Sequence, residues 1–562
     1  MGTLIPLRVT APGFYGLNKQ NTVGNDLHWA SECDNTVIDA KGRLAVRKAR
    51  LTVTSAAISG TPRIRALFEQ VLSNGTTVIL SAAAAKLYSG TSTLTDITGT
   101  AGDGTGITDA HWQFQNINNN VVGFQSGHDP IFRTTGNFSL LQQQLSAWVA
   151  TTAYVVGDVV RATSGNLTIY FHCTVSGTSG GTEPTWTTGE GGTTTDGTVT
   201  WITRTMPTGN VCHSAFSRIW VTGSNPSIIE FSDTLLPAKF RGGAAGTLDL
   251  KTVWAGDLVI AISSFENLLV IFGRKTILLY TGASDPATMV LTEKLEGVGT
   301  FARDSLGHTG NDLLFLSDSG VRLLSRTVAS GGKEPLGDLS MHVRDDMMAS
   351  AVAEDVDVIK SAYHEPEGFY VISFPAAGYD YVFDLRFPNP DRTPKITRWR
   401  NFGSTAYFSA RDRNLYCGGA GVVARYSGYN DGTTGTYAVT YRSTWVDIVD
   451  PPWAAGRIKI PKHWSLKIIT NKAYQVVFVW GYDYDETLSS SVANIIARGT
   501  GSEWGIFEWG IGEWSGSDAF ASLRENPTGN GTVMRFGFNL TVDGSPFALQ
   551  QLNILYKLGR FE

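Results

Sequence analysis

Two glycine-rich stretches are the nearest approaches in this sequence to phosphate-binding loops. "SGGKEPLG" (330–337) contains Gly-Lys, but Glu334 stands where a P-loop requires Ser or Thr, and the first glycine is misplaced. "GVGTFA" (297–302) fits the loose GxGxxA pattern, yet no helical periodicity follows it. Neither stretch supports a nucleotide site, so we expect no cofactor.

Hydrolytic motifs are also missing from the sequence. It contains no HExxH and no GxSxG, and its nine histidines are scattered. "SDSGVRLL" (317–324) has neither the Asp spacing nor the Trp of the S-x-D-x-G-x-x-W boxes of sialidases. The acidic stretch "RDDMMASAVAEDVDVIK" (344–360) has a helical pattern with a charged, solvated face. We expect no catalytic or metal-binding residues and no enzyme, with a glycosidase as a less favoured alternative because sequence does not give carboxylate separations.

Aromatic side chains within residues 147–204 could bind sugars, because ring faces stack on pyranose faces. In "TIYFHCTV" (168–175), Phe171, Cys173 and Val175 alternate with the other residues and should face a small core. Their neighbours should face outward, and the candidate glycan-contacting residues are Tyr170, His172 and Trp186. The alternative is that the large aromatic residues form the core that so short a segment needs, namely Trp148, Tyr154, Trp186 and Trp201.

A second aromatic pattern is "SEWGIFEWGIGEW" (502–514), with tryptophans at every fifth position, Trp504, Trp509 and Trp514. Side chains that are five residues apart cannot all lie on one face of a helix or strand. The glycines between them favour a looped connection. We interpret the tryptophans as candidate subunit contacts rather than as a sugar-binding stripe.

Composition indicates a mainly β protein. Charged residues are 17% of the 562-residue chain, and glycine (62 residues) and aromatic residues are abundant, which favours strands and tight turns. The net charge of −5, without a basic block, argues against tight nucleic-acid binding. No signal peptide and no apolar stretch long enough to span a membrane are visible. The four scattered cysteines are expected to be buried free thiols.

A hairpin recurs along the middle of the chain. Its first strands start near Thr77, Val121, Ile219, Leu269, Asp312, Tyr370 and Leu415. The steps between these starts are 44, 98, 50, 43, 58 and 45 residues, and removing a 57-residue stretch of distinct composition (147–203) from the long step leaves 41. A repeat of about 40–50 residues built from strands predicts a β-propeller, here with six or seven blades.

The expected organisation has four parts. Residues 1–60 form an N-terminal platform segment, 61–430 the interrupted propeller, 147–204 an inserted all-β module, and 431–562 a C-terminal β platform or nozzle domain. The long alternating strands near the C-terminus predict a sandwich-like platform or tip built from both chain ends. The module resembles small carbohydrate-binding modules of the chitin-binding type, through "AWVATTAYVVGDVV" and the later Pro-Thr-Trp.

The order of the remaining parts resembles the tail nozzle proteins of short-tailed bacteriophages, also called tail tubular proteins B. The resemblance rests on three stretches: the early Gly-Leu-Asn-x-Gln, "DAKGRLAVRK" (39–48) and the late "GSPFALQQLNILYKLGRF" (544–561). It implies a virion protein assembled in the host cytoplasm, with six copies in a ring below a tail adaptor and beside tail fibres or tailspikes. Such a ring would gate and conduct double-stranded DNA without sequence-specific binding. The alternative function is an adhesin that binds host-surface glycan.

Overall fold

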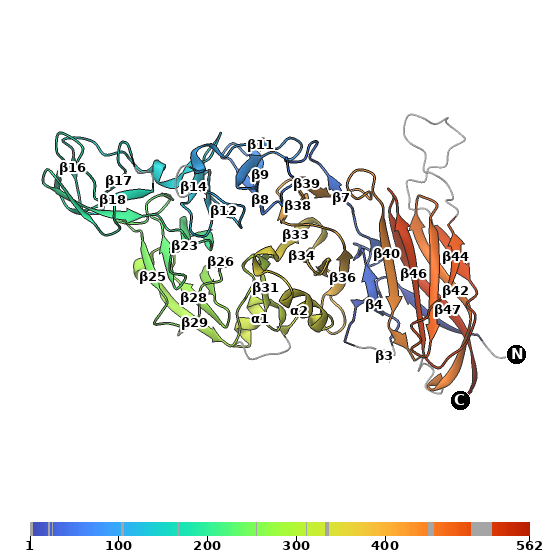
Figure 1. Cartoon of the computed structure of the whole chain (residues 1–562). Helices are drawn as coiled ribbons and strands as arrows, with labels where there is room; N and C mark the ends of the chain where they lie inside the picture. The colour runs from blue at the N-terminus through green and yellow to red at the C-terminus, as the bar shows by residue number, and fades with distance from the viewer. Residues whose placement is uncertain are drawn as a thin grey trace.

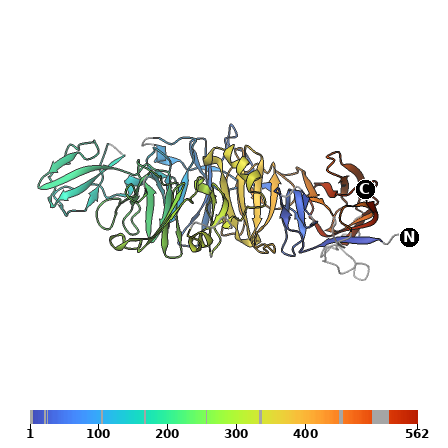
Figure 2. The same ribbon diagram turned by 90° about the horizontal axis from the view of Figure 1, so that it is seen from below.

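The structure is a computed structural model. It describes residues 4–20, 23–24, 26–102, 106–165, 168–254, 256–310, 312–331, 337–447, 454–495 and 520–561. Three parts follow one another along an elongated body, with the module at one end, the propeller in the middle and a β-sandwich at the other end (Figures 1 and 2). Both chain termini lie at the sandwich end (Figure 2).

The propeller has seven blades, each an antiparallel sheet whose innermost strand faces a common axis. The first two blades are β8 (Ala66–Val71), β9 (Thr77–Ala83), β10 (Lys86–Ser89) and β11 (Thr95–Asp96), then β12 (Gln113–Ile117), β13 (Asn120–Phe124), β14 (Ile131–Arg133) and β15 (Ser139–Leu140). The next two are β22 (Cys212–Ala215), β23 (Arg218–Thr222), β24 (Ile228–Phe231) and β25 (Gly246–Asp249), then β26 (Ala261–Phe265), β27 (Leu268–Phe272), β28 (Thr276–Thr281) and β29 (Val290–Glu296).

The last three blades depart from this simple order. The fifth has three strands, β30 (Gly307–His308), β31 (Leu313–Ser317) and β32 (Gly320–Leu323), and helices α1 (Leu324–Ala329) and α2 (Arg344–Val352) pack beside it. The sixth is β33 (Lys360–His364), β34 (Phe369–Phe374), β35 (Tyr379–Asp384) and β36 (Lys395–Arg400). The seventh is β37 (Tyr407–Ser409), β38 (Leu415–Gly418), β39 (Val423–Tyr426) and the early strand β7 (Arg50–Thr52), which closes the ring.

The predicted fold class is confirmed, and the blade number is seven. Each predicted hairpin start lies within one residue of the start of the second strand of its blade. These second strands are largely buried, as in β27, where Leu269–Phe272 are fully buried. Their continuous apolar runs made them visible in the sequence. The predicted helix within 344–360 is present as α2.

The sandwich combines strands from both ends of the chain. One sheet has the order β45 (Phe520–Glu525), β42 (Arg457–Thr470), β47 (Phe547–Phe561), β6 (Leu44–Val46) and β5 (Thr36–Ile38), with β1 (Ile5–Thr10) also paired to β47. The facing sheet contains β4 (Trp29–Asp34), β40 (Tyr437–Ser443), β41 (Trp445–Val446), β46 (Met534–Val542), β43 (Gln475–Tyr482) and β44 (Ser489–Asn494). Their inner faces pack together, as where the Trp464 and Phe478 rings meet edge to face with centroids 4.5 Å apart.

One sheet runs without a break from the sandwich into the propeller. Strand β2 (Gly16–Leu17) pairs in parallel with both β4 and β36, so the sixth blade continues into the sandwich sheet. A buried ion pair crosses the same joint, with Arg398 Nε 2.8 Å from Asp34 Oδ1. A shared apolar core extends from the sandwich to the fifth and sixth blades. The two parts are therefore one packed body.

The inserted module leaves the chain between the second and third blades. Its main sheet has the order β17 (Val159–Val160), β18 (Ile169–Val175), β21 (Val199–Thr205) and β20 (Thr193–Asp196), and β16 (Ala153–Tyr154) pairs with β19 (Gly177–Thr178). Among the described residues, no helix is long and apolar enough to cross a membrane. All four cysteines are buried and free, which confirms the prediction for them.

Candidate functional site

The aromatic side chains of the module form its core. Trp148 and Trp201 are buried in one cluster, with Tyr154 and Trp186 packed against it. The indole Nε1 atoms of Trp148 and Trp201 both donate to Asp196 Oδ2, at 2.7 and 3.2 Å. The Asp196 side chain is itself buried, so it satisfies two indole donors that the core would otherwise leave unpaired. Trp148 and Trp201 are therefore core residues, as the alternative predicts, whereas Tyr154 and Trp186 are only partly buried against them.

Tyr170 does not face outward, and this prediction is wrong. Its side chain is fully buried in the cluster that joins the module to the second and third blades, together with Leu145, Met206 and Phe240. Alternation along β18 places Tyr170 and His172 on the face opposite Phe171, but that face is covered by the propeller instead of water. Tyr170 is therefore unavailable to a glycan.

The register of β18 also corrects the assignment of Val175. A β-bulge interrupts the pairing of β18 with β21 between Cys173 and Val175. Because the bulge inserts one residue, the alternation is lost beyond it, and the Val175 side chain is exposed instead of facing the core. The alternation of inward and outward side chains that the sequence predicted extends only to Cys173.

The other two candidate glycan residues lie on different faces of the module. His172 is half-buried, and burial, reinforced by Arg204 and Arg241, lowers its pKa below the ordinary value. The half-buried Trp186 ring stacks on Phe171 at a centroid distance of 3.7 Å, and its Nε1 donates to Glu183 at 2.8 Å. The structure does not bring Tyr170, His172 and Trp186 together into one binding surface. Trp504, Trp509 and Trp514 lie outside the described residues, between strands β44 and β45.

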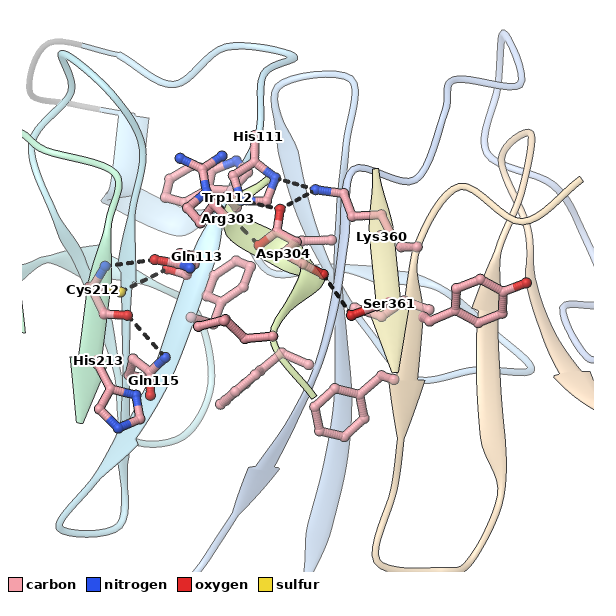
Figure 3. Close-up of a pocket in the computed structure, with 18 of the residues that line it drawn as sticks. His111, Trp112, Gln113, Gln115, Cys212, His213, Arg303, Asp304, Lys360 and Ser361 are labelled. Atoms are coloured by element: carbon pink, nitrogen blue, oxygen red, sulfur yellow. Dashed lines mark hydrogen bonds and ion pairs between the residues drawn. The ribbon is translucent and has the colours of Figure 1, made fainter. Parts of the chain in front are cut away.

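A cluster of ionisable side chains lies at the axis of the propeller. His111 precedes β12, Asp304 lies in the short 3-10 helix Arg303–Ser305 before β30, and Lys360 begins β33. Lys360 Nζ donates to His111 Nδ1 at 2.7 Å and to Asp304 Oδ2 at 2.6 Å (Figure 3). Because these residues come from the second, fifth and sixth blades, one ammonium group connects blades across the axis.

Electrostatics fix the charge state of this axial cluster. Burial lowers the pKa of His111 well below its ordinary value, so the ring is neutral near pH 7 and its Nδ1 can accept from Lys360. Burial opposes ionisation of Asp304, but the neighbouring His111, Lys360 and Arg303 side chains outweigh it and hold its pKa below the usual range. Burial also lowers the pKa of Lys360, against the attraction of Asp304. The cluster holds an ionised carboxylate beside two cations.

A cavity of about 340 Å³ lies beside the cluster along the axis. Four aromatic side chains line it: Trp112, which precedes β12, Phe114 in β12, Phe68 in β8 and Phe408 in β37. At its other side, His213 Nε2 lies 2.9 Å from Ser264 Oγ and His308 Nε2 lies 3.1 Å from Ser263 Oγ. Within the described residues, no group of three or more His, Cys, Asp or Glu side chains is placed to hold a metal ion.

Sequence reasoning missed the axial residues, although the repeat contained a signal for them. His111 lies ten residues before Val121, and Lys360 lies ten residues before Tyr370. Lys360 therefore begins the innermost strand of its repeat, and His111 lies just before the innermost strand of its own. Polar residues at equivalent positions of several propeller repeats converge on the axis, whatever their separation in sequence.

Comparisons with known proteins find distant similarity in fold and no similarity in sequence family. No family model matches the chain, and no curated protein sequence matches it. Among solved structures, it is similar to the WD40 domain of Neurospora crassa Pan2, with 10% identity over 66% of this chain and 93% of that chain and a TM-score of 0.34. It is also similar to the extracellular domain of the putative hybrid two component system BT4673 of B. thetaiotaomicron, with 11% identity over 74% of this chain and 42% of that chain and a TM-score of 0.26. The propeller assignment rests on the sheet order described above.

Proposed function

We propose that this chain is a structural subunit of a bacteriophage virion, the tail nozzle, and that six copies form a ring around the path of double-stranded DNA. The observation that carries this proposal is the unbroken sheet that joins the sixth blade to the sandwich. A subunit that transmits force between an adaptor and a receptor must not hinge at its middle. A continuous sheet, a shared core and a buried ion pair at the joint meet that requirement.

The propeller axis supports a DNA path between subunits and not through one subunit. Side chains from opposite blades meet across the axis at Lys360, and the space beside them is only about 340 Å³. A duplex cannot pass through such a space. A conduit built from these chains therefore requires several copies around a common opening, and a closed cyclic ring is the arrangement that heterologous contacts produce.

The charge of the chain is compatible with conduction of DNA. Tight phosphate binding by clustered Lys and Arg would hold the duplex in place. The net charge of −5 and the many ion-paired basic residues, such as Arg65 with Asp109 at 2.9 Å, favour sliding over binding. The proposed role is mechanical and electrostatic, in the tail of the virion.

Assembly of the purified full chain tests this proposal. Native mass spectrometry and negative-stain microscopy, with and without the tail adaptor, should detect a ring of six copies of the 60.7 kDa chain. Trp509→Ala should reduce the ring fraction, whereas Trp186→Ala, which alters a tryptophan of the module core, should leave ring assembly unchanged. A chain that stays monomeric under all these conditions would contradict the nozzle assignment.

A further inference from the structure

We propose that the axial cavity of the propeller binds a small organic acid, with its carboxylate at the Arg303–His111–Lys360 side and its apolar part against Phe68 and Phe408. This inference does not depend on the nozzle assignment. It rests on hydrogen-bond donors that the cavity leaves unpaired, on the charges around it and on its apolar wall.

The first argument is an excess of buried donors. Within the described part of the chain, His111 Nε2 and Arg303 Nε are buried and make no hydrogen bond. The side chains are only 7% and 8% exposed, so water outside the protein does not satisfy them. His111 Nε2 lies 3.3 Å and Arg303 Nε 3.9 Å from carboxylate oxygens of Asp304, without hydrogen-bond geometry. Buried donors without acceptors are costly, and an acceptor placed between them would remove that cost.

The second argument is charge. Arg65, Arg303 and Lys360 line the cavity, against the one carboxylate of Asp304. Among the residues that the structure describes, Lys360 makes two of its three possible donations, to His111 and Asp304 (Figure 3). Asp109 and Asp357 balance Arg65 and Arg303 from outside this lining, so the selection comes from the unpaired donors of His111 and Arg303 beside these cations, which favour an anionic acceptor.

The third argument is the shape and polarity of the remaining wall. Phe68, Leu306 and Phe408 line the cavity and are only half-buried, because they face its open space. The Phe68 and Phe408 ring centroids are 5.7 Å apart. A volume of about 340 Å³ with one polar end and one aromatic wall suits a small ligand that has an acid group and an apolar body.

A second cavity adjoins the polar end. It has a volume of about 210 Å³ and shares Arg65, His111 and Lys360 with the first. Its acidic residues include Asp109 and Asp357, which are already paired with Arg65 at 2.9 Å and with Arg303 at 2.8 Å. Paired carboxylates in this second cavity repel an incoming anion less than unpaired carboxylates would.

Calorimetric titration of the full chain at pH 7 with three probes tests the inference. Benzoate carries both the acid and the ring, benzyl alcohol has the ring without the charge, and acetate has the charge without the ring. We expect benzoate to bind with a dissociation constant of about 1 mM or tighter, and at least tenfold more tightly than either other probe. No binding of benzoate, or equal binding of benzyl alcohol, would overturn the proposal and leave a cavity that holds only water.

Substitutions of cavity residues test whether benzoate binds in the axial cavity. Arg303→Gln removes the unpaired Nε donor, together with the ion pair to the half-exposed Asp357 and the hydrogen bond to the Asn210 backbone oxygen, and we expect it to weaken benzoate binding at least fivefold. Arg274→Gln is the matched control, because Arg274 is 60% exposed and lies outside the cavity. Phe408→Trp fills the apolar wall without removing a charge and should also weaken binding, which keeps the test valid if Arg303→Gln does not fold. Unchanged benzoate affinity in every folded cavity variant would overturn the location.

Discussion

At the residue scale, the most informative titratable group is Asp380 in β35. Its carboxylate is buried between the sixth and seventh blades and accepts a hydrogen bond of 2.7 Å from the Tyr407 hydroxyl. Burial raises its pKa to about 6, above its ordinary value near 4. The folded protein therefore holds a proton at Asp380 in a pH range where the unfolded chain has released it.

The sign of the effect on stability follows from proton binding. Between about pH 4 and pH 6 the native state binds more protons at Asp380, so the free energy of unfolding falls as pH rises, by about 3 kcal/mol in total from this group. Asp380→Asn keeps an acceptor for Tyr407 and cannot ionise. We expect its stability relative to the wild type to increase from pH 4 to pH 6.5, measured by urea denaturation.

A surface variant controls for the loss of a charge. Asp345 is 79% exposed, so Asp345→Asn should show little change relative to the wild type across the same pH range. If the difference between Asp380→Asn and the wild type is constant with pH, burial of an ionised Asp380 is not the cause of the pH dependence.

At the element scale, the contact between module and propeller includes a close approach of two turns at Gly157 and Gly242. A Cβ atom on Gly242 would lie 2.0 Å from the backbone oxygen of Gly157, so the two turns touch with no room for a side chain. Gly242→Val should push the module away from the third blade and expose β18. Hydrogen exchange should then increase in 169–173, while the propeller strands stay protected.

The matched control for this variant is Gly256→Val. Gly256 also has a positive φ (+86°), but a Cβ there meets nothing within 4 Å. It carries the same backbone strain without the clash. Equal exchange in 169–173 for both variants would show that crowding at Gly242 does not hold the module in place.

The joint between propeller and sandwich gives a second prediction at this scale. Arg398→Met leaves the buried Asp34 carboxylate without its partner, which we expect to cost about 4 kcal/mol. Asp34→Leu together with Arg398→Met removes both charges and should restore most of the loss. Differential scanning calorimetry should show a large fall in transition temperature for the single variant and a smaller one for the double variant. Equal losses in the two variants would contradict a role for the unpaired charge.

The elements also show what the sequence could and could not predict. The second strands of the blades are buried on both faces, so their apolar runs and Gly-containing turns marked the repeat. Alternation along β18 correctly grouped Tyr170 with His172, but it does not say what covers that face, which here is another part of the chain. The axial cluster joins residues 111, 304 and 360, and only the closure of the ring brings them together.

At the scale of the whole molecule, the chain is one long body with its termini at the sandwich end (Figure 2). Closure of the propeller by β7 and the shared strands of the sandwich tie residues near the N-terminus to residues near the C-terminus. The module is the part farthest from the sandwich (Figure 1). In a ring of such subunits, the sandwich and propeller supply the wall and the module lies at the end away from the sandwich.

Cryo-electron microscopy of the virion that carries this chain tests the nozzle assignment most directly. We predict six copies in a ring at the distal part of a short tail, with the DNA path between the copies and the axis of each propeller closed at Lys360. A location in the capsid shell, absence from the particle, or DNA density within a propeller axis would contradict it.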